Sequence, residues 1–271
     1  MKRILITGAA SGIGAATALH LDRCGMEVFA GVRSLDGEDA LSGASDRLRR
    51  ISLDVTDAGS IAEAIASVGG AGLDGLVNNA GIGVPGPLEL LSAEDLRRQL
   101  DVNVVGQVAV TQAALPLLRA RAGRVVFVGS VGGKLASQFA GAYHASKFAM
   151  ESVADVWRQE LEPEEIAVIL IEPSVISTPI WDKAAEQIDG LLAGADPRVT
   201  RYRDRLKEFR ESLRSADEHG KSPDDVAAAI EQALTDDSPD TRYVVGAAGK
   251  VATALRPLIP DRLADKLAER G

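Results

Sequence analysis

Short apolar runs alternate with longer segments of helical periodicity from residue 1 to about residue 172. Such alternation is typical of repeated strand–helix units, in which parallel strands form one sheet and helices cover both of its faces. We predict strands near 3–7, 27–32, 50–54, 73–77, 124–129, 166–172 and 241–246, and helices near 13–24, 60–68, 92–120, 143–162 and 223–235. The expected fold class is therefore α/β, a doubly wound parallel sheet of about seven strands.

The segment 174–221 interrupts this alternation, because it is long, rich in charge and carries helix-like stretches near 180–193 and 198–216. Insertions of this size between a strand and the next helix usually serve function, so we expect a substrate lid on a single domain that spans 1–271. The C-terminal tail 250–271 is expected to pack on the parent domain or on a partner subunit, with a membrane-surface contact as the alternative. Its apolar side consists of Leu255, Leu258, Ile259, Leu263 and Leu267.

Charge and cysteine content narrow the range of functions. The formal net charge of -9 argues against a nucleic-acid surface, because binding phosphates needs clustered Lys and Arg. Cys24 is the single cysteine, so no intrachain disulfide and no cysteine-based metal cluster can form, and no metal site is expected. No run approaches the roughly 18 apolar residues of a membrane-spanning helix. These features are typical of a cytoplasmic protein.

A glycine-rich turn follows the first predicted strand and reads Thr7-Gly8-Ala9-Ala10-Ser11-Gly12-Ile13-Gly14. Glycines allow a tight turn and a close approach to a ligand, while the helix that follows presents unpaired amides and the positive end of its dipole. The position of the turn between the first strand and the first helix indicates a binding site for the pyrophosphate of a dinucleotide.

The spacing T-G-x-x-x-G-x-G resembles that of the classical short-chain dehydrogenase/reductase family. Further signatures of that family follow in order, namely Asn78-Asn79-Ala80-Gly81, Asn103, Ser130 and Tyr143-His144-Ala145-Ser146-Lys147. The resemblance covers about residues 1–180 and implies a Rossmann-like fold and hydride transfer between NADP(H) or NAD(H) and an alcohol or carbonyl compound. It implies a catalytic set of Ser130, Tyr143, Lys147 and Asn103. The cofactor contacts that it implies are Gly8, Ser11, Gly12, Ile13, Gly14, Asp54, Val55, Asn79, Ala80, Gly81, Tyr143, Lys147, Pro173, Ile176 and Thr178.

Tyr143 and Lys147 lie four positions apart, so on a helix they share a face and can converge on one ligand. A free tyrosine has a pKa near 10, and a neighbouring ammonium lowers it by favouring the phenolate. A drop of roughly three units corresponds to about 4 kcal/mol, which one close lysine and the positive ring of an oxidised nicotinamide can supply in a shielded cleft. Tyr143 is therefore expected to be the acid–base group.

Ser130 follows the predicted central strand, at the edge where ligands gather in open α/β sheets. A nucleophilic serine needs a base, and the sequence places no histidine in a triad-like arrangement, so a hydrolase is disfavoured. Ser130 is instead expected to donate a hydrogen bond to the substrate oxygen. In the family that these residues resemble, Asn103 holds a water that links Lys147 to solvent. His144 points about 100° away from Tyr143 on the helix and is expected to be structural.

The end of the second strand usually decides between NAD and NADP. A carboxylate there accepts hydrogen bonds from the ribose of NAD, whereas an arginine suits the extra phosphate of NADP. This strand ends at Val32 and Arg33 without a carboxylate, so we predict that Arg33 contacts the cofactor and that NADP(H) is preferred. Asp36, a few residues later, leaves NAD(H) possible. Asp54 resembles the family residue beside the adenine.

The chain departs from the family pattern after the sixth strand, where Pro173-Ser174 replaces the usual Pro-Gly. The expected contacts of Ile176 and Thr178 therefore depend on whether position 174 needs a positive φ angle. The segment 28–33, the long lid and the strand near 242–246 resemble the branch of the family that acts on retinoids, steroids and other lipophilic alcohols.

The leading hypothesis is an NADP(H)-dependent oxidoreductase of a lipophilic secondary alcohol or ketone. One alternative is a non-catalytic dinucleotide-binding regulator, against which the complete catalytic set counts. Another is a reductase of 3-oxoacyl chains on an acyl carrier protein, which needs a basic docking surface; the basic residues of 198–207 offer one, or form a solvated helix. Helices 92–120 and 143–162 resemble those that form subunit contacts in the family, so a homodimer or homotetramer is expected.

Overall fold

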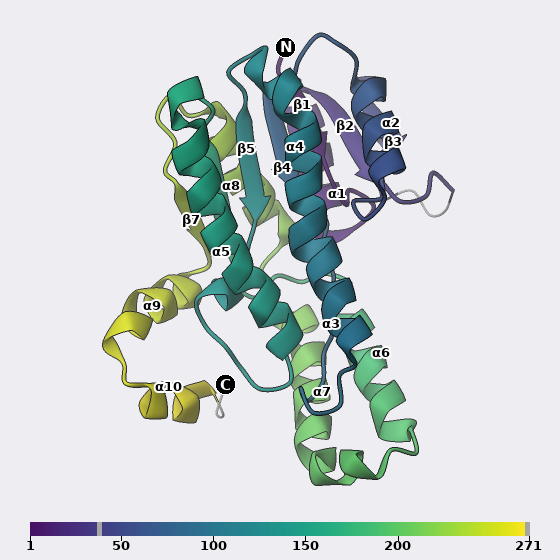
Figure 1. Cartoon of the computed structure of the whole chain (residues 1–271), viewed down its shortest axis with the longest axis vertical. Coiled ribbons are helices and arrows are strands. Elements are labelled where there is room, and N and C mark those ends of the chain that lie inside the picture. Colours follow the sequence, from purple (N-terminus) through teal and green to yellow (C-terminus); the bar gives the residue numbers. More distant parts are fainter. Residues whose placement is uncertain (37–39, 269–271) are drawn as a thin grey trace.

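The computed structural model describes residues 1–36 and 40–268, and its described strands form one parallel sheet in the order β3-β2-β1-β4-β5-β6-β7 (Figure 1). The strands are β1 (Arg3–Ile6), β2 (Glu27–Val32), β3 (Leu48–Ser52), β4 (Gly75–Asn78), β5 (Arg124–Val128), β6 (Val168–Pro173) and β7 (Arg242–Val245). The predicted fold class is confirmed. β3 is displaced as a whole, because it both begins and ends two residues before the expected 50–54, with Leu48 paired to Val28.

Helices cover both faces of the sheet (Figure 1). One face carries α1 (Gly12–Arg23) and α8 (Pro223–Thr235); the other carries α2 (Ala58–Val68), α4 (Gly106–Arg119) and α5 (Gly141–Leu161). The single helix predicted over 92–120 is divided into α3 (Ala93–Leu100), a π-helical turn (Asp101–Val105) and α4. A π turn inserts one residue into a helix, and such turns are frequent at functional sites.

Each face of the sheet has its own apolar core, because alternate residues of a strand point to opposite faces. In β1, Ile4 and Ile6 pack against α1 and α8, whereas Leu5 points toward α2 and α4. All three side chains are fully buried, which explains why this strand shows continuous apolar character.

The order in which strands are added to the sheet reverses at β1. β2 and β3 extend the sheet on one side of β1, and β4 to β7 extend it on the other. Such a switch point opens a crevice at the carboxyl ends of the strands, where ligands of doubly wound folds bind. The glycine-rich turn, the Asn79 loop and Ser130 all follow strands that end at this edge.

The expected lid contains α6 (Ile180–Ala193) and α7 (Arg203–His219), which lie beyond the carboxyl edge of the sheet (Figure 1). The predicted helix over 198–216 is resolved into a 3-10 turn (Pro197–Arg201) and α7, because Pro197 and Asp196 start a separate short turn. The two helices share a small core that includes Ile188, Leu206 and Leu213.

The C-terminal tail forms α9 (Ala247–Leu255) and α10 (Asp261–Ala268), so it begins before the expected residue 250. Leu255, Leu258 and Leu263 are largely exposed rather than packed on the rest of the chain. The side chain of Leu267 lies outside the described residues. Over the described ranges, each helix is too short or too polar to cross a membrane.

Candidate active site

The glycine-rich turn has the geometry of a phosphate cradle. Gly8 and Gly12 have φ angles of +67° and +54°, which glycine adopts without strain. A Cβ atom at Gly14 would lie 2.3 Å from the carbonyl oxygen of Gly8, so the helix start and the turn need a glycine to pack together. Ser11 at the N-cap of α1 makes no capping hydrogen bond. The first amides of α1 therefore lack a side-chain acceptor, which fits a pyrophosphate at this helix end.

Thr7 joins this turn to the loop after β4. Its Oγ1 accepts hydrogen bonds from the amides of Asn79 (3.0 Å) and Ala80 (2.9 Å). The Asn79 side chain donates in return to the carbonyl oxygens of Thr7 and Gly8. The structure thus brings the two predicted cofactor-binding segments together. Sequence analysis did not assign a role to Thr7, although it opens the glycine motif.

A buried row of polar side chains supports the loop after β4. It consists of Gln99, Asn103, Gln107 and Thr111, which are all fully buried and lie at intervals of four residues. Gln99 accepts from the amide of Val84 (2.8 Å), and Gln107 donates to the carbonyl oxygen of Ala80 (2.9 Å). Sequence analysis did not single out the two glutamines; the regular interval along one helical face is the signal that identifies them.

Asn103, in the π turn, holds the same loop. Its Oδ1 accepts from the amide of Ile82 (2.8 Å), and its Nδ2 donates to the carbonyl oxygen of Ile82 and to Ser146 Oγ. Both amide hydrogens are therefore used within the protein. The Asn103 side chain thus fixes the loop that adjoins Gly81 and the helix that carries Tyr143. The predicted role of Asn103, to hold a water linked to Lys147, stays a prediction.

Ser130 begins a short 3-10 turn (Val131–Gly133) after β5. Its Oγ accepts from the amide of Gly132 (3.0 Å) and donates, at a long 3.4 Å, to the carbonyl oxygen of Pro173. His144 Nδ1 bonds the carbonyl oxygen of Gly132 (2.9 Å), and burial lowers the pKa of His144 below its ordinary value. A neutral ring donates through Nδ1, so His144 holds the serine turn, in agreement with the predicted structural role.

Tyr143 and Lys147 lie one turn apart on α5, as predicted from their spacing. The Lys147 ammonium donates to the carbonyl oxygen of Val128 (2.9 Å) and lies 5.7 Å from the centre of the Tyr143 ring. Burial lowers the pKa of Lys147 to about 8. Burial also raises the pKa of Tyr143 above its ordinary value, and its hydrogen bond with Ser130 acts in the opposite direction. The chain alone therefore does not make this phenol acidic, because desolvation disfavours the phenolate.

Arg33 and Asp54 lie near each other at the carboxyl ends of β2 and β3. Arg33 is exposed, and its charge contributes to a lowered pKa of Asp54, whose carboxylate chiefly accepts hydrogen bonds from the backbone and hydroxyl of Thr56. The next predicted contact, Val55, is buried against Gly106. Asp36 is exposed within a local turn with Ser34.

Ser174 adopts ordinary backbone geometry, since the described non-glycine residues with positive φ are Ala122, Phe139 and Glu165. Its hydroxyl fills space beside Gly246, where a Cβ would lie 2.0 Å from Ser174 Oγ. The absence of glycine at 174 is thus compensated by a glycine directly after β7.

The segment that follows Ser174 reaches the phosphate cradle. A Cβ at Gly12 would lie 3.2 Å from Thr178 Cγ2, so Thr178 lies against the turn. The Ile176 side chain is buried, and its carbonyl oxygen accepts from the Trp181 indole at 2.6 Å.

Phe139 connects the lid to the catalytic region. Its backbone has a φ angle of +65°, and its carbonyl oxygen accepts from the amide of Gly86 (2.7 Å). Its ring packs edge-on against Tyr202, at 6.2 Å between centroids, and against Phe209 at 5.6 Å. Sequence analysis missed Phe139, because no glycine or asparagine marks this left-handed position.

Comparisons with known proteins agree with this geometry. A family model described as short chain dehydrogenase matches residues 2–189. A 3-amino-tetrahydro-pyrrolizinone reductase from Xenorhabdus hominickii is 38% identical over 90% of this chain and 87% of its own length. Retinol dehydrogenase 16 from Mus musculus is 36% identical over 98% of this chain and 87% of its own length. A solved short-chain dehydrogenase from Streptomyces avermitilis has a TM-score of 0.80 and 29% identity, over 99% of this chain and 96% of that one.

The strand order, the phosphate cradle and the convergence of Ser130 with Tyr143 and Lys147 all agree with these similarities. They identify an oxidoreductase that uses a nicotinamide dinucleotide and acts on CH–OH donors. The chain belongs to the short chain dehydrogenase family.

Proposed function

We propose that the chain transfers a hydride between NADP(H) and a lipophilic secondary alcohol or ketone, with Tyr143 as the acid–base group. The observation that carries this proposal is the convergence of Ser130, Tyr143 and Lys147 at the carboxyl end of β5, beside the glycine-rich cradle. A non-catalytic regulator has no need of a desolvated lysine beside a partly buried phenol.

In the proposed reduction, a reduced nicotinamide held at the cradle of Gly8, Gly12 and Gly14 would supply the hydride for the carbonyl carbon. Tyr143 gives its proton to the carbonyl oxygen, which becomes the alcohol. Ser130 is free to turn its hydrogen from Pro173 to the same oxygen, because that contact is long whereas the amide of Gly132 continues to hold its lone pair. Lys147, with a pKa of about 8, stabilises the tyrosinate and can return a proton to it near neutral pH. Oxidation of the alcohol runs through the same steps in reverse.

Arg33 supports the preference for NADP(H). Its guanidinium is exposed beside the end of β2, whose last residue Val32 and the following Arg33 offer no carboxylate to a ribose, and an arginine binds a phosphate with several donors at once. The test is a comparison of kcat/KM for the two cofactors. A strong preference for NAD(H) removes Arg33 from this role.

A lipophilic substrate is favoured by the apolar surroundings of the site. A groove of about 390 Å³ lies between the loop after β4 and α6, with apolar lining that includes Val84, Leu90 and Leu191. Leu88 is 62% exposed and lies against Gly141, at the start of the helix that carries Tyr143. The similarity to retinol dehydrogenases supports the same substrate class.

A carrier-protein-linked substrate is less favoured, because three of the basic residues of 198–207, namely Arg198, Arg201 and Lys207, have acidic partners. Arg198 pairs with Asp196 (2.7 Å), and Lys207 lies 3.6 Å from Asp204. The deciding experiment follows the absorbance of the reduced nicotinamide with a panel of lipophilic ketones, secondary alcohols and short 3-oxoesters. Turnover restricted to the 3-oxoesters would overturn the proposed substrate class, and no turnover with any member of the panel would favour the regulator.

The proposal extends to domain roles and assembly. Residues 1–271 act as one catalytic domain, with 174–221 as the substrate lid and 250–271 as a tail. Helices α4 and α5 form the contact of a homodimer or homotetramer, supported by the half-exposed apolar side chains of Phe148 and Val156 on α5. Light scattering on the purified protein and on Phe148→Glu tests the contact: the variant is expected to dissociate, and a wild-type monomer would refute it.

A further inference from the structure

A fully buried carboxylate, Glu172, lies beside the candidate active site and takes no part in the proposed chemistry. Lys134 Nζ contacts both of its oxygens, at 2.6 and 2.7 Å, and Arg242 Nε lies 3.2 Å from Oε1. A carboxylate at this depth is costly unless it is paired and hydrogen-bonded, and Lys134 and Arg242 supply these contacts.

The contact between Lys134 and Glu172 connects the two segments that hold Ser130, namely its own turn and the end of β6. Glu172 immediately precedes Pro173, whose carbonyl oxygen accepts from Ser130 Oγ. Lys134 is the C-cap of the short turn that Ser130 begins. The serine turn is therefore attached through its own backbone to Lys134 and, until the hydroxyl turns to a substrate oxygen, through that hydroxyl to the strand that carries Glu172.

Arg242 extends this set of charges to the helix of the catalytic pair. Its guanidinium contacts Glu151 Oε2 (3.1 Å) and Asp155 Oδ1 (2.9 Å), both on α5. Glu151 lies one turn after Lys147, and a Cβ at Gly133 would be 2.9 Å from the carbonyl oxygen of Lys147. The turn that Ser130 begins therefore packs closely against α5 on one side. On the other side, the ion pairs of Glu172 with Lys134 and Arg242 link it to β6 and β7.

We propose that Lys134, Glu172 and Arg242 are positioning residues, which set the place of the Ser130 hydroxyl relative to Tyr143. The inference rests on the proposed function only in giving Ser130 a substrate oxygen to bond. Positioning acts on the chemical step, because a displacement of about 1 Å in a reacting group can cost on the order of 100-fold in rate. Cofactor affinity depends on the cradle at α1 and is expected to stay unchanged.

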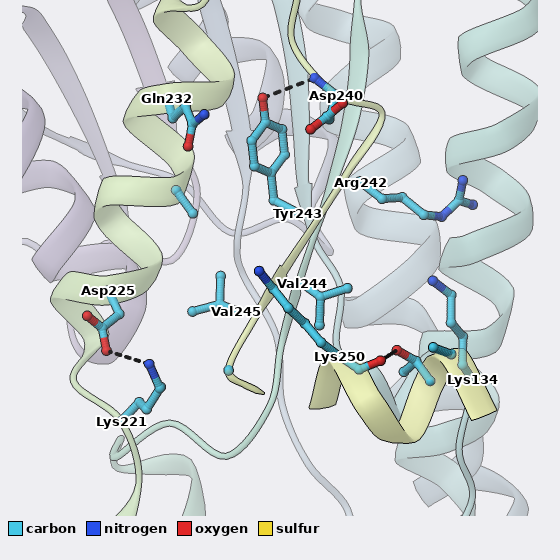
Figure 2. Close-up of a pocket in the computed structure, with 14 residues that line it drawn as sticks. Lys134, Lys221, Asp225, Gln232, Asp240, Arg242, Tyr243, Val244, Val245 and Lys250 are labelled. Atoms are coloured by element: carbon cyan, nitrogen blue, oxygen red, sulfur yellow. Dashed lines mark hydrogen bonds and ion pairs between the residues drawn. The ribbon is translucent and has the colours of Figure 1, made fainter. Parts of the chain in front are cut away.

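A groove of about 840 Å³ beside β7 makes the network accessible to small molecules. Lys134, Arg242 and Lys250 line it, and Figure 2 shows Lys134 and Arg242 on its α5 side, with the Lys250 side chain lying across β7. The Lys134 side chain is about one-third exposed, whereas the Glu172 side chain is inaccessible. Truncation of Lys134 therefore opens a route by which a small amine can reach Glu172.

The first test compares Lys134→Ala, Lys134→Arg and Lys250→Ala in the cofactor-loaded enzyme. Lys134→Ala is expected to lower kcat by about 10- to 100-fold with cofactor KM unchanged. Lys134→Arg keeps most of the activity, and ethylammonium restores part of the loss in Lys134→Ala alone. Lys250→Ala is the matched control, because it removes a lysine from the same groove without touching Glu172. Wild-type kcat in Lys134→Ala, or equal stimulation of all proteins by the amine, would overturn the proposal.

A second measurement does not depend on turnover. The Tyr143 titration is read from the ultraviolet difference between each protein and its Tyr143→Phe counterpart; it is expected to move to higher pH in Lys134→Ala, because Ser130 no longer supports the phenolate. The double variant Lys134→Met/Glu172→Gln leaves no unpaired buried carboxylate and is expected to fold yet show the same shift. An unchanged Tyr143 titration in both variants refutes positioning. If Lys134→Ala shows this shift while the wild-type protein turns over no substrate, the positioning stands and the proposed function fails.

Discussion

The ammonium group of Lys147 donates a hydrogen bond to the carbonyl oxygen of Val128, 2.9 Å away, in a setting almost closed to water. The helix that carries Lys147 is thereby attached to the end of the central strand. The same burial lowers the pKa of Lys147 from 10.5 to about 8, which suits proton transfer near neutral pH. Burying the charged ammonium also lowers the stability of the folded chain.

Lys147→Met is expected to make the protein more stable at pH 7 while abolishing turnover. Between pH 8 and 10.5 the unfolded chain holds the lysine proton that the folded chain releases, so this contribution to stability rises with pH. Below pH 8 the cost of the buried charge is complete, about 3 kcal/mol, offset by about 1 kcal/mol for the bond to Val128. Urea denaturation should give a gain of about 2 kcal/mol at pH 7 that shrinks toward pH 10. A variant less stable than wild type at pH 7 contradicts this.

Tyr143→Phe is expected to lower kcat by about 10²- to 10⁴-fold, because the proton donor is lost while the ring is kept. Cofactor affinity, measured by quenching of protein fluorescence, should stay within about twofold, since the cradle is untouched. Tyr202→Phe is the matched control: it removes a lid hydroxyl that donates to Glu89 and should retain activity. Retained turnover in Tyr143→Phe rejects the mechanism.

Gly14→Ala is expected to abolish cofactor binding or folding, because the added methyl meets both the carbonyl oxygen of Gly8 and the Asn79 amide group. The first partner is backbone, and the second is the Asn79 side-chain amide, which hydrogen bonds to Thr7 and Gly8 hold in place, so the cradle must open. Gly70→Ala adds the same methyl where nothing lies within 4 Å and should behave as wild type. Titration with reduced cofactor distinguishes the two, and normal binding by Gly14→Ala shows that the cradle can relax.

Phe139→Gly is expected to be more stable than Phe139→Ala, by about 1 kcal/mol, although glycine is normally the less stable of the two. Both variants lose the contacts with Tyr202 and Phe209, but only glycine relieves the left-handed backbone. Thermal unfolding measures the difference. The reverse order of stability means that the backbone changes conformation when the ring is removed.

Arg33→Asp is expected to lower kcat/KM for NADPH by at least about tenfold and to raise it for NADH, because a carboxylate repels the extra phosphate and accepts from a ribose. Steady-state kinetics with both cofactors gives the ratio. A ratio equal to that of wild type assigns cofactor choice to other residues.

Strand and helix positions could be predicted closely where the periodicity was strong. The lid helix α6 begins and ends where its pattern indicated, and α8 does too. The π turn at Asn103 could not be predicted, because an inserted residue leaves the polar and apolar composition of a helix unchanged. The displacement of β3 has a different cause: its burial is incomplete and Arg49 and Arg50 stand in it, so alternation alone fixes its ends poorly.

The motif residues of the site could be predicted because each has a fixed spacing from its neighbours. The residues that support them could not. Lys134 and Glu172 lie 38 positions apart in the sequence, and their contact depends on the pairing of β5 with β6. The space beside Gly246 that accommodates Ser174 likewise exists only once β7 has joined the sheet.

The helices α6 and α7 share a small apolar core of their own, so they form one packing unit. Their apolar side chains pack chiefly on one another, with Phe139 and Leu90 as attachments, so we expect substitutions on the side that faces the proposed substrate cleft to leave the folding of the parallel sheet undisturbed. A fold arranged in this way can vary the proposed substrate site within one segment while the residues around Tyr143 stay unchanged.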